Sequence, residues 1–464
     1  MSKSNIVTVL RFDRLVLAAS RRRAGSTQPV SEIMPRLPLA ALTIVLVLAA
    51  NLAETQTSEP FEQPPFNYST TQPRDAISRL QGRLASGALK FTGTGKEVVQ
   101  SLLHELQIPP ESQTLVFSKT SFQRSRIRPE QPRAIYYSDT CYVGWVPNGL
   151  VEIAVIDPEL GPIYYSFDPG AIEPGFVRDQ DCLRCHGGTF VRGIPGVFVR
   201  SVFTDEAGEP LLRFGSEVVD FRTPFTNRWG GWYVTGKHGT TLHRGNVLAR
   251  DKNGELIADL RRGANRSDLA SLFETKSYLA SGSDIVALLV LEHQLAMQNT
   301  LTRASLDCRR MLAYQRNLQR DLKEPVTEEL TYESVKRVFD GAAKDVVDDL
   351  LFKDEAVLPK GLAGSAAFQA AFLAEACRAR DGSSLRDFQL DGHLFQNRCS
   401  YLIYSECFLA LPNALKNRVY ARLAHALHPT DPDARYSHLG AEERARIVRI
   451  LRETHSEFRN LLKD

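Results

Sequence analysis

Residues 134–167 read AIYYSDTCYVGWVPNGLVEIAVIDPELGPIYYSF. This stretch contains runs of β-branched and aromatic side chains, and turn-forming residues separate the runs at Ser138-Asp139, at Pro147-Asn148-Gly149 and over 157–161. Such a pattern is typical of strands joined by hairpins. It predicts antiparallel strands over 134–137, 142–146, 150–155 and 163–167, with a further strand over 114–118 before them.

Helical patterns lie on both sides of these strands. Residues 75–85 and 95–106 predict two short amphipathic helices. Ser283-Asp284 has the residue types of a helix N-cap and predicts a long helix that reaches about residue 322. Beyond Pro325 the chain is expected to be helical to its end, over 331–352, 366–378, 402–411, 415–427 and 441–462.

The expected fold class is therefore α+β. An antiparallel sheet, with a PAS-like arrangement as one option, forms a domain over 76–282, and a helical C-terminal domain follows over 283–464. Two further short strands are predicted over 197–203 and 211–214, on either side of a turn. A segment rich in Pro, Thr, Gln and Ser over 54–75 predicts a linker.

The first 53 residues have the features of a targeting segment. Arg21-Arg22-Arg23 and Arg36 precede an apolar run over 39–50, and small residues that suit a cleavage site near Ala53 follow it. The long basic part suggests that translation begins at Met34. An uncleaved anchor helix is the alternative, although the run is short for a full membrane span. The expected location is the periplasm or another exported compartment.

A short motif, Cys182-Leu183-Arg184-Cys185-His186, follows the predicted strands. C-x-x-C-H is the attachment signature of a c-type haem. The two thiols each add to a haem vinyl group, and the histidine that follows supplies a neutral imidazole nitrogen as proximal iron ligand. Because such a haem is attached outside the cytoplasmic membrane, the motif and the targeting segment point to the same compartment.

A zinc site and a redox dithiol are competing interpretations of this motif, and both are less well supported. A structural zinc site needs a second ligand pair, and the sequence has no other C-x-x-C. A redox dithiol of the thioredoxin kind needs a βαβ context, which the chain around Cys182 lacks. The sequence thus predicts one covalent haem c held by Cys182, Cys185 and His186.

The motif specifies only one face of the iron, so the sixth ligand stays open. His238, in a loop rich in tryptophan and glycine, is the first candidate, and His243 is the next. His293 and Met297 are one turn apart on the apolar stripe of the predicted long helix and are weaker candidates. An open or water-bound iron is the remaining option.

Several further residues have uncertain roles. Cys141, Cys308, Cys377, Cys399 and Cys407 are expected to be buried small hydrophobes, although some of them can pair in an oxidising compartment. A basic cluster could hold haem propionates, face an acidic redox partner or be a solvated loop; it comprises Lys119, Arg124, Arg126, Arg128 and Arg133. The formal net charge of +3 gives no indication of a nucleic-acid binder.

The chain also resembles a known family. The carrying segments are 61–69 (FEQPPFNYS), 115–121 (LVFSKTS), 142–146 (YVGWV), the C-x-x-C-H, 229–239 (WGGWYVTGKHG) and 399–405 (CSYLIYS). Together they resemble exported bacterial mono-haem cytochrome c domain proteins, over roughly residues 60–460. This resemblance implies haem binding and electron transfer, with roles for Cys182, Cys185 and His186, but no substrate.

A weaker resemblance is to extracytoplasmic sensor domains of PAS-like fold that carry a c-type haem. There too a strand precedes C-x-x-C-H, and a glycine-rich loop and a strand follow it, as residues 193–203 do here. No kinase follows in this chain. The function expected from the sequence is electron transfer to partner proteins; a haem-based sensor and an oxidoreductase with an open iron are the alternatives.

Overall fold

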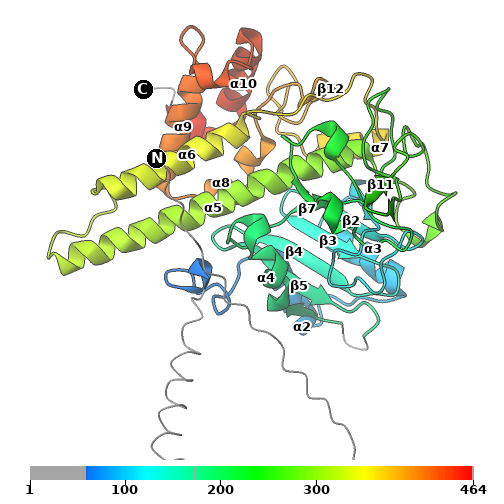
Figure 1. Cartoon of the computed structure of the whole chain (residues 1–464). Coiled ribbons are helices and arrows are strands. Elements are labelled where there is room, and N and C mark those ends of the chain that lie inside the picture. The colour runs from blue at the N-terminus through cyan, green and yellow to red at the C-terminus, as the bar shows by residue number, and fades with distance from the viewer. Residues whose placement is uncertain (1–58, 172–173, 462–464) are drawn as a thin grey trace, which may run out of the picture. The chain divides into compact units, whose positions relative to one another are not determined.

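The computed structural model describes residues 59–171 and 174–461 (Figure 1). The predicted targeting segment over 1–53 lies outside these described residues. Within the described part of the chain, no helix is long and apolar enough to cross a membrane.

The central element is a seven-stranded sheet with the strand order β6-β5-β4-β3-β2-β1-β9, in which every neighbouring pair is antiparallel. The five strands predicted from the sequence are confirmed as β1 to β5, whereas β6 and β9 were not predicted. The strands are β1 Thr114–Val116, β2 Arg133–Tyr137, β3 Cys141–Trp145, β4 Val151–Asp157, β5 Gly161–Phe167, β6 Phe176–Arg178 and β9 Trp232–Tyr233.

Two different helical layers bury the two faces of this sheet. One face packs against α2 (Ala76–Ala85) and α3 (Gly95–Glu105), and alternate residues of the strands, such as Val143, Ile153 and Ile163, fill the core between them. The opposite face meets α5 (Ile285–Asp321) through side chains that include Tyr137 and Tyr142. Burial of each such side chain contributes about 1.5–3 kcal/mol.

Hydrogen bonds fix α5 on the sheet as well. The Tyr137 hydroxyl donates to the Ala287 carbonyl at 2.6 Å, and Gln294 Nε2 donates to the Tyr142 hydroxyl at 2.8 Å. Asp284 caps the helix as predicted, because its carboxylate accepts from the backbone N–H groups of Val286 and Ala287 at 3.0 Å each. The predicted boundary between residues 282 and 283 thus coincides with the start of a helix that packs directly on the sheet.

The remaining helices lie along α5 or beyond it, and Figure 1 shows α6 beside α5. They confirm a helical C-terminal region and so the α+β class. These helices are α6 Glu333–Leu350, α7 Ala366–Ala374, α8 Glu406–Leu409, α9 Asn413–Ala426, α10 Ala441–Thr454 and α11 Ser456–Leu461. The described residues also form three small two-stranded antiparallel sheets: β7 Val199–Ser201 with β8 Glu217–Val219, β10 Arg250–Lys252 with β11 Glu255–Ile257, and β12 Phe388–Asp391 with β13 His393–Phe395.

Three local predictions were wrong. The region beyond Pro325 is not helical throughout, because β12 and β13 form a hairpin that turns at Gly392, which has a φ of +79°. The helix predicted over 402–411 is interrupted by Ser405, whose extended backbone starts the short α8 instead. The strand predicted over 211–214 is a 3-10 turn over Leu212–Phe214, since only an isolated bridge between Thr204 and Pro210 forms there.

The described part of the predicted linker is packed. Phe61, Phe66 and Tyr68 are buried in the core between the sheet and α2 and α3. The Tyr68 hydroxyl donates to the Pro162 carbonyl in β5 at 2.5 Å. Aromatic residues therefore make residues 59–75 part of the fold, although their Pro, Thr and Ser content is typical of a linker.

Candidate functional site

The C-x-x-C-H motif forms a 3-10 turn over Gln180–Cys182 followed by the one-turn helix α4 (Leu183–His186). Figure 1 shows α4 next to β4 and β5. The Asp179 carboxylate accepts from the Asp181 backbone N–H at 3.0 Å and starts the turn, and Gly187 ends the helix. All seven cysteines are free; Cys182 is half-buried and Cys185 is exposed. Both motif thiols are therefore available for covalent attachment.

His186 is held in a defined orientation. Its Nδ1 lies 2.8 Å from the Gly196 carbonyl oxygen, which only accepts, so the ring proton is on Nδ1. The ring packs between Tyr164 and Phe198, with centroid separations of 5.1 and 4.9 Å. Burial lowers the pKa of His186 to about 4, so the imidazole is neutral at neutral pH. Nε2 has no hydrogen-bond partner among the described residues, so it is the ring nitrogen that is available to coordinate a metal.

The Gly196 carbonyl is itself fixed from two sides. The Tyr164 hydroxyl donates to the same oxygen at 2.6 Å. Asn299 on α5 clamps the next residue, because its Oδ1 accepts from the Val197 N–H at 2.9 Å and its Nδ2 donates to the Val197 carbonyl at 2.7 Å. The sequence analysis did not predict Tyr164, Gly196 or Asn299 as supports of His186. Of the three, only Gly196 lies in a feature that the sequence made visible, the glycine-rich loop over 193–196.

Gly196 has no room for a side chain. A Cβ there would lie 2.7 Å from Val191 Cβ and 2.9 Å from Asn299 Oδ1. We expect Gly196→Ala to lower the free energy of unfolding by about 1–3 kcal/mol, because overpacking displaces the loop that holds His186. Chemical denaturation measures this. The matched control is Gly82→Ala in α2, where nothing lies within 4 Å, and this variant should be as stable as the wild type or more so. A Gly196→Ala protein as stable as Gly82→Ala would contradict the prediction.

The structure places His238 and His243 together in a separate buried cluster. Their ring centroids are 4.5 Å apart, and both rings contact Phe225. His238 Nδ1 lies 2.7 Å from the Thr241 carbonyl, and its Nε2 accepts from the Asn265 backbone N–H at 2.8 Å. Both ring nitrogens of His238 are thus engaged within the protein.

His293 and Met297 lie on α5 and are buried in the core. His293 Nε2 lies 2.8 Å from the Ser400 hydroxyl, and its ring stacks on Phe352 at 4.1 Å. Met297 is fully buried in the same hydrophobic core as the α5–α6 interface. Within 59–171 and 174–461, none of the four predicted sixth ligands forms a ring contact or hydrogen bond with His186.

The tryptophans and the remaining cysteines have packing roles in this structure. Trp145 packs on Tyr278, Trp229 packs between Phe225 and His243, and Trp232 Nε1 donates to the Arg200 carbonyl at 2.7 Å. Four of the five cysteines outside the motif are buried and Cys377 is exposed. In the described residues, no group of three or more His, Cys, Asp or Glu side chains is arranged to hold a metal ion.

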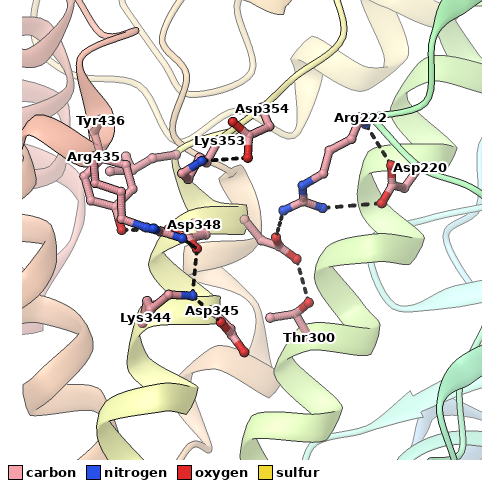
Figure 2. Close-up of polar contacts among 12 residues, drawn as sticks. Asp220, Arg222, Thr300, Lys344, Asp345, Asp348, Lys353, Asp354, Arg435 and Tyr436 are labelled. Atoms are coloured by element: carbon pink, nitrogen blue, oxygen red, sulfur yellow. Dashed lines mark hydrogen bonds and ion pairs between the residues drawn. The ribbon is translucent and has the colours of Figure 1, made fainter. Parts of the chain in front are cut away.

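A cavity of about 440 Å³ adjoins the site, with Phe190 and Phe198 on one side and α5 and α6 on the other. Figure 2 shows polar contacts of several residues that line this cavity, among them Asp220, Arg222 and Thr300. The Arg222 guanidinium donates hydrogen bonds to the Asp349 carboxylate and, at 3.3 Å, to the Asp220 carboxylate. The Thr300 hydroxyl also donates to Asp349, at 2.5 Å.

Asp348, on the same wall, is bonded by Arg435 Nε at 2.7 Å and by the Tyr436 hydroxyl at 3.0 Å. Lys344 Nζ donates to its carboxylate at 3.2 Å. The buried carboxylates of Asp348 and Asp349 are therefore satisfied within the protein. Their bonds tie α5, α6 and the segment around Tyr436 together.

Comparisons with known proteins add no identification: no family model, no curated protein and no solved structure matches this chain. The assignment of the site therefore depends on the residues described above. Cys182 and Cys185 are two free thiols on one helical turn. The adjacent His186 is neutral; its Nδ1 is anchored by the Gly196 carbonyl, and its Nε2 has no hydrogen-bond partner among the described residues.

Proposed function

We propose that the chain is an exported c-type cytochrome that carries one electron on a single covalently attached haem. The observation that carries this proposal is the arrangement of C-x-x-C-H on α4. Cys182 and Cys185 are free thiols, and the Gly196 carbonyl anchors His186 through Nδ1. A backbone carbonyl on the second ring nitrogen is the usual support of a metal-ligating histidine.

The donor set fits a c-type haem. Cys182 and Cys185 would form the two thioether bonds, and His186 Nε2 would be the proximal ligand. When bound, the haem supplies the Fe(III)/Fe(II) couple. The protein's own residues prepare the ligand: the Gly196 carbonyl holds the proton on Nδ1, and Tyr164 and Phe198 restrict rotation of the imidazole. Burial lowers the pKa of His186 and keeps it in the neutral form that ligates.

The wider proposal follows from the sequence. The N-terminal segment would export the chain, and the protein would contact the membrane only through that segment if it stays uncleaved. Its partners would be redox proteins rather than nucleic acids. Membership of the exported mono-haem cytochrome c domain proteins and a PAS-like arrangement of the sheet are parts of the same hypothesis.

One observation favours a second candidate function. Both ring nitrogens of His238, the first sixth-ligand candidate, are already hydrogen-bonded inside the protein, whereas His243 Nε2 and His293 Nδ1 have no partner in the described residues. A haem on His186 without a protein ligand on its other face would bind gases or substrates, as in a haem-based sensor or an oxidoreductase.

An optical titration of the native, haem-loaded protein separates the two functions. A carrier with both axial positions filled should give the same reduced spectrum with and without carbon monoxide. Ready binding of carbon monoxide or cyanide would count against the carrier and support the sensor or oxidoreductase. The spectra of His238→Ala, His293→Ala and Met297→Ala then identify the sixth ligand, because only loss of the true ligand changes the low-spin absorbance.

A further inference from the structure

One part of the sheet carries charged residues on the face that bears the haem motif. Glu152 in β4 pairs with Gly144 in β3 on one side and with Ser166 in β5 on the other, so these three residues point to the same face. Tyr164 precedes Ser166 by two residues and shares this face, and the His186 ring packs on it at 5.1 Å. Glu152 is thus a diagonal neighbour of the tyrosine that supports the proximal histidine.

Arg133 reaches across the sheet to this glutamate. It lies in β2, and its Nη2 is 2.6 Å from Glu152 Oε2 in β4, with β3 between them. The crossing depends on Gly144, because a Cβ at this position would lie 2.1 Å from Arg133 Nη2. Both side chains of the pair are only 18% exposed. The guanidinium therefore lies against the backbone of the sheet instead of extending into solvent.

The pair is not saturated by hydrogen bonds. Arg133 Nε and Glu152 Oε2 are both buried, and neither has a well-aligned hydrogen-bond partner in the described residues. The charges act mainly as an ion pair at low exposure, where screening by solvent is weak.

The charges of Arg133 and Glu152 act electrostatically on residues of the C-x-x-C-H motif. Burial raises the pKa of Cys182 to about 12; Asp179 and, after it, Glu152 contribute in the same direction, and Arg133 acts in the opposite direction. Arg133 also lowers the pKa of His186, because it disfavours the positive form of the imidazole. Thus the Arg133 cation lies within electrostatic range of both Cys182 and His186, and the Glu152 carboxylate lies within range of Cys182.

Three other residues of the basic cluster form ion pairs away from the motif. Lys119 and Arg124 pair with Glu209 at 3.1 and 3.2 Å, and Arg128 pairs with Glu130 at 3.9 Å with both partners more than half exposed. Of the ion pairs that these cations form in the described part of the chain, only that of Arg133 lies on the strands beside α4.

From these contacts we infer that Arg133 and Glu152 shift the reduction potential of the haem held by His186 in opposite directions, so that their pairing keeps the potential near its value without either charge. This inference rests on the proposed function. Ferric haem carries one more positive charge than ferrous haem, so a nearby cation favours the ferrous state and a nearby carboxylate favours the ferric state. In the wild type the two effects largely cancel, and removal of either partner exposes the other.

The test is a spectroelectrochemical titration of the haem-loaded, full-length protein. Glu152→Gln leaves the Arg133 cation uncompensated and should raise the midpoint potential. Arg133→Met leaves the Glu152 carboxylate and should lower it. The double variant should return close to the wild-type value, and Arg133→Lys, which keeps the charge, should stay close to it.

A matched control uses the pair formed by Arg316 and Glu328, which is more exposed. Arg316→Met and Glu328→Gln should leave the potential unchanged. The inference is overturned if haem-loaded Glu152→Gln and Arg133→Met both keep the wild-type potential, or if both shift it in the same direction, which indicates a merely structural role. Failure of the proposed function is a distinct result, because the wild type itself would then contain no haem to titrate.

Discussion

Simultaneous replacement of Cys182 and Cys185 by serine is expected to abolish covalent haem attachment completely. Serine has nearly the same size as cysteine, but its hydroxyl does not add to a vinyl group as a thiolate does. Both thiols lie on one helical turn beside His186, Cys182 half-buried and Cys185 exposed, so their loss removes the chemistry and leaves the fold. Haem that remains with the polypeptide after denaturing electrophoresis measures the effect.

Single variants and a control define this result further. Cys182→Ser and Cys185→Ser should each keep one thioether bond, at reduced yield. Cys377→Ser changes an exposed cysteine outside the motif and should keep the full haem content. Haem that stays covalently bound to the double variant would show that the attachment lies elsewhere in the chain.

The second large effect concerns stability. Arg228 is almost fully buried, and its Nη1 donates to Glu292 Oε2 on α5 at 2.6 Å. Its Nε donates to the Thr223 carbonyl at 2.8 Å, and its Nη2 donates to the Phe221 carbonyl at 3.0 Å. Arg228→Ala leaves a buried carboxylate without its counter-ion and two carbonyls without donors. We expect a loss of about 3–5 kcal/mol in the free energy of unfolding, measured by urea denaturation.

Two comparisons test the cause of this loss. Arg316→Ala removes an arginine whose ion pair with Glu328 is exposed, and it should cost less than about 1 kcal/mol. Arg228→Met combined with Glu292→Gln removes both charges and should cost less than the sum of the two single changes. A loss below about 1 kcal/mol for Arg228→Ala would mean that the Arg228–Glu292 ion pair contributes little to holding the segment around Trp229 on α5.

The sequence predicted those parts of the fold that local chemistry determines. Turn residues such as Pro147-Asn148-Gly149 separate β3 from β4, and Asp284 caps α5, so both elements appear where they were expected. The pairing of β9 with β1 joins residues more than a hundred positions apart. Nothing local to Trp232 and Tyr233 indicates that partner, and the strand was therefore missed.

In the candidate site, too, the features encoded by neighbouring residues were predicted and those formed by distant residues were not. C-x-x-C-H is a contiguous signal, and its role in haem attachment stays a prediction with a supporting geometry. The support of His186 comes from Tyr164, Gly196 and Asn299, which are brought together only by the folded chain. His238 was chosen because glycines surround it, yet in the structure its ring nitrogens bond the backbone around Thr241 and Asn265.

Covalent haem on this chain can be detected by intact-mass spectrometry of the exported protein, made in a host with a working haem-attachment system. We expect a single haem-sized increment on the polypeptide, located by peptide mapping to the fragment that contains Cys182 and Cys185. A polypeptide without that increment, produced alongside a known c-type cytochrome that does acquire haem in the same cells, would contradict the proposed haem attachment and with it the proposed function.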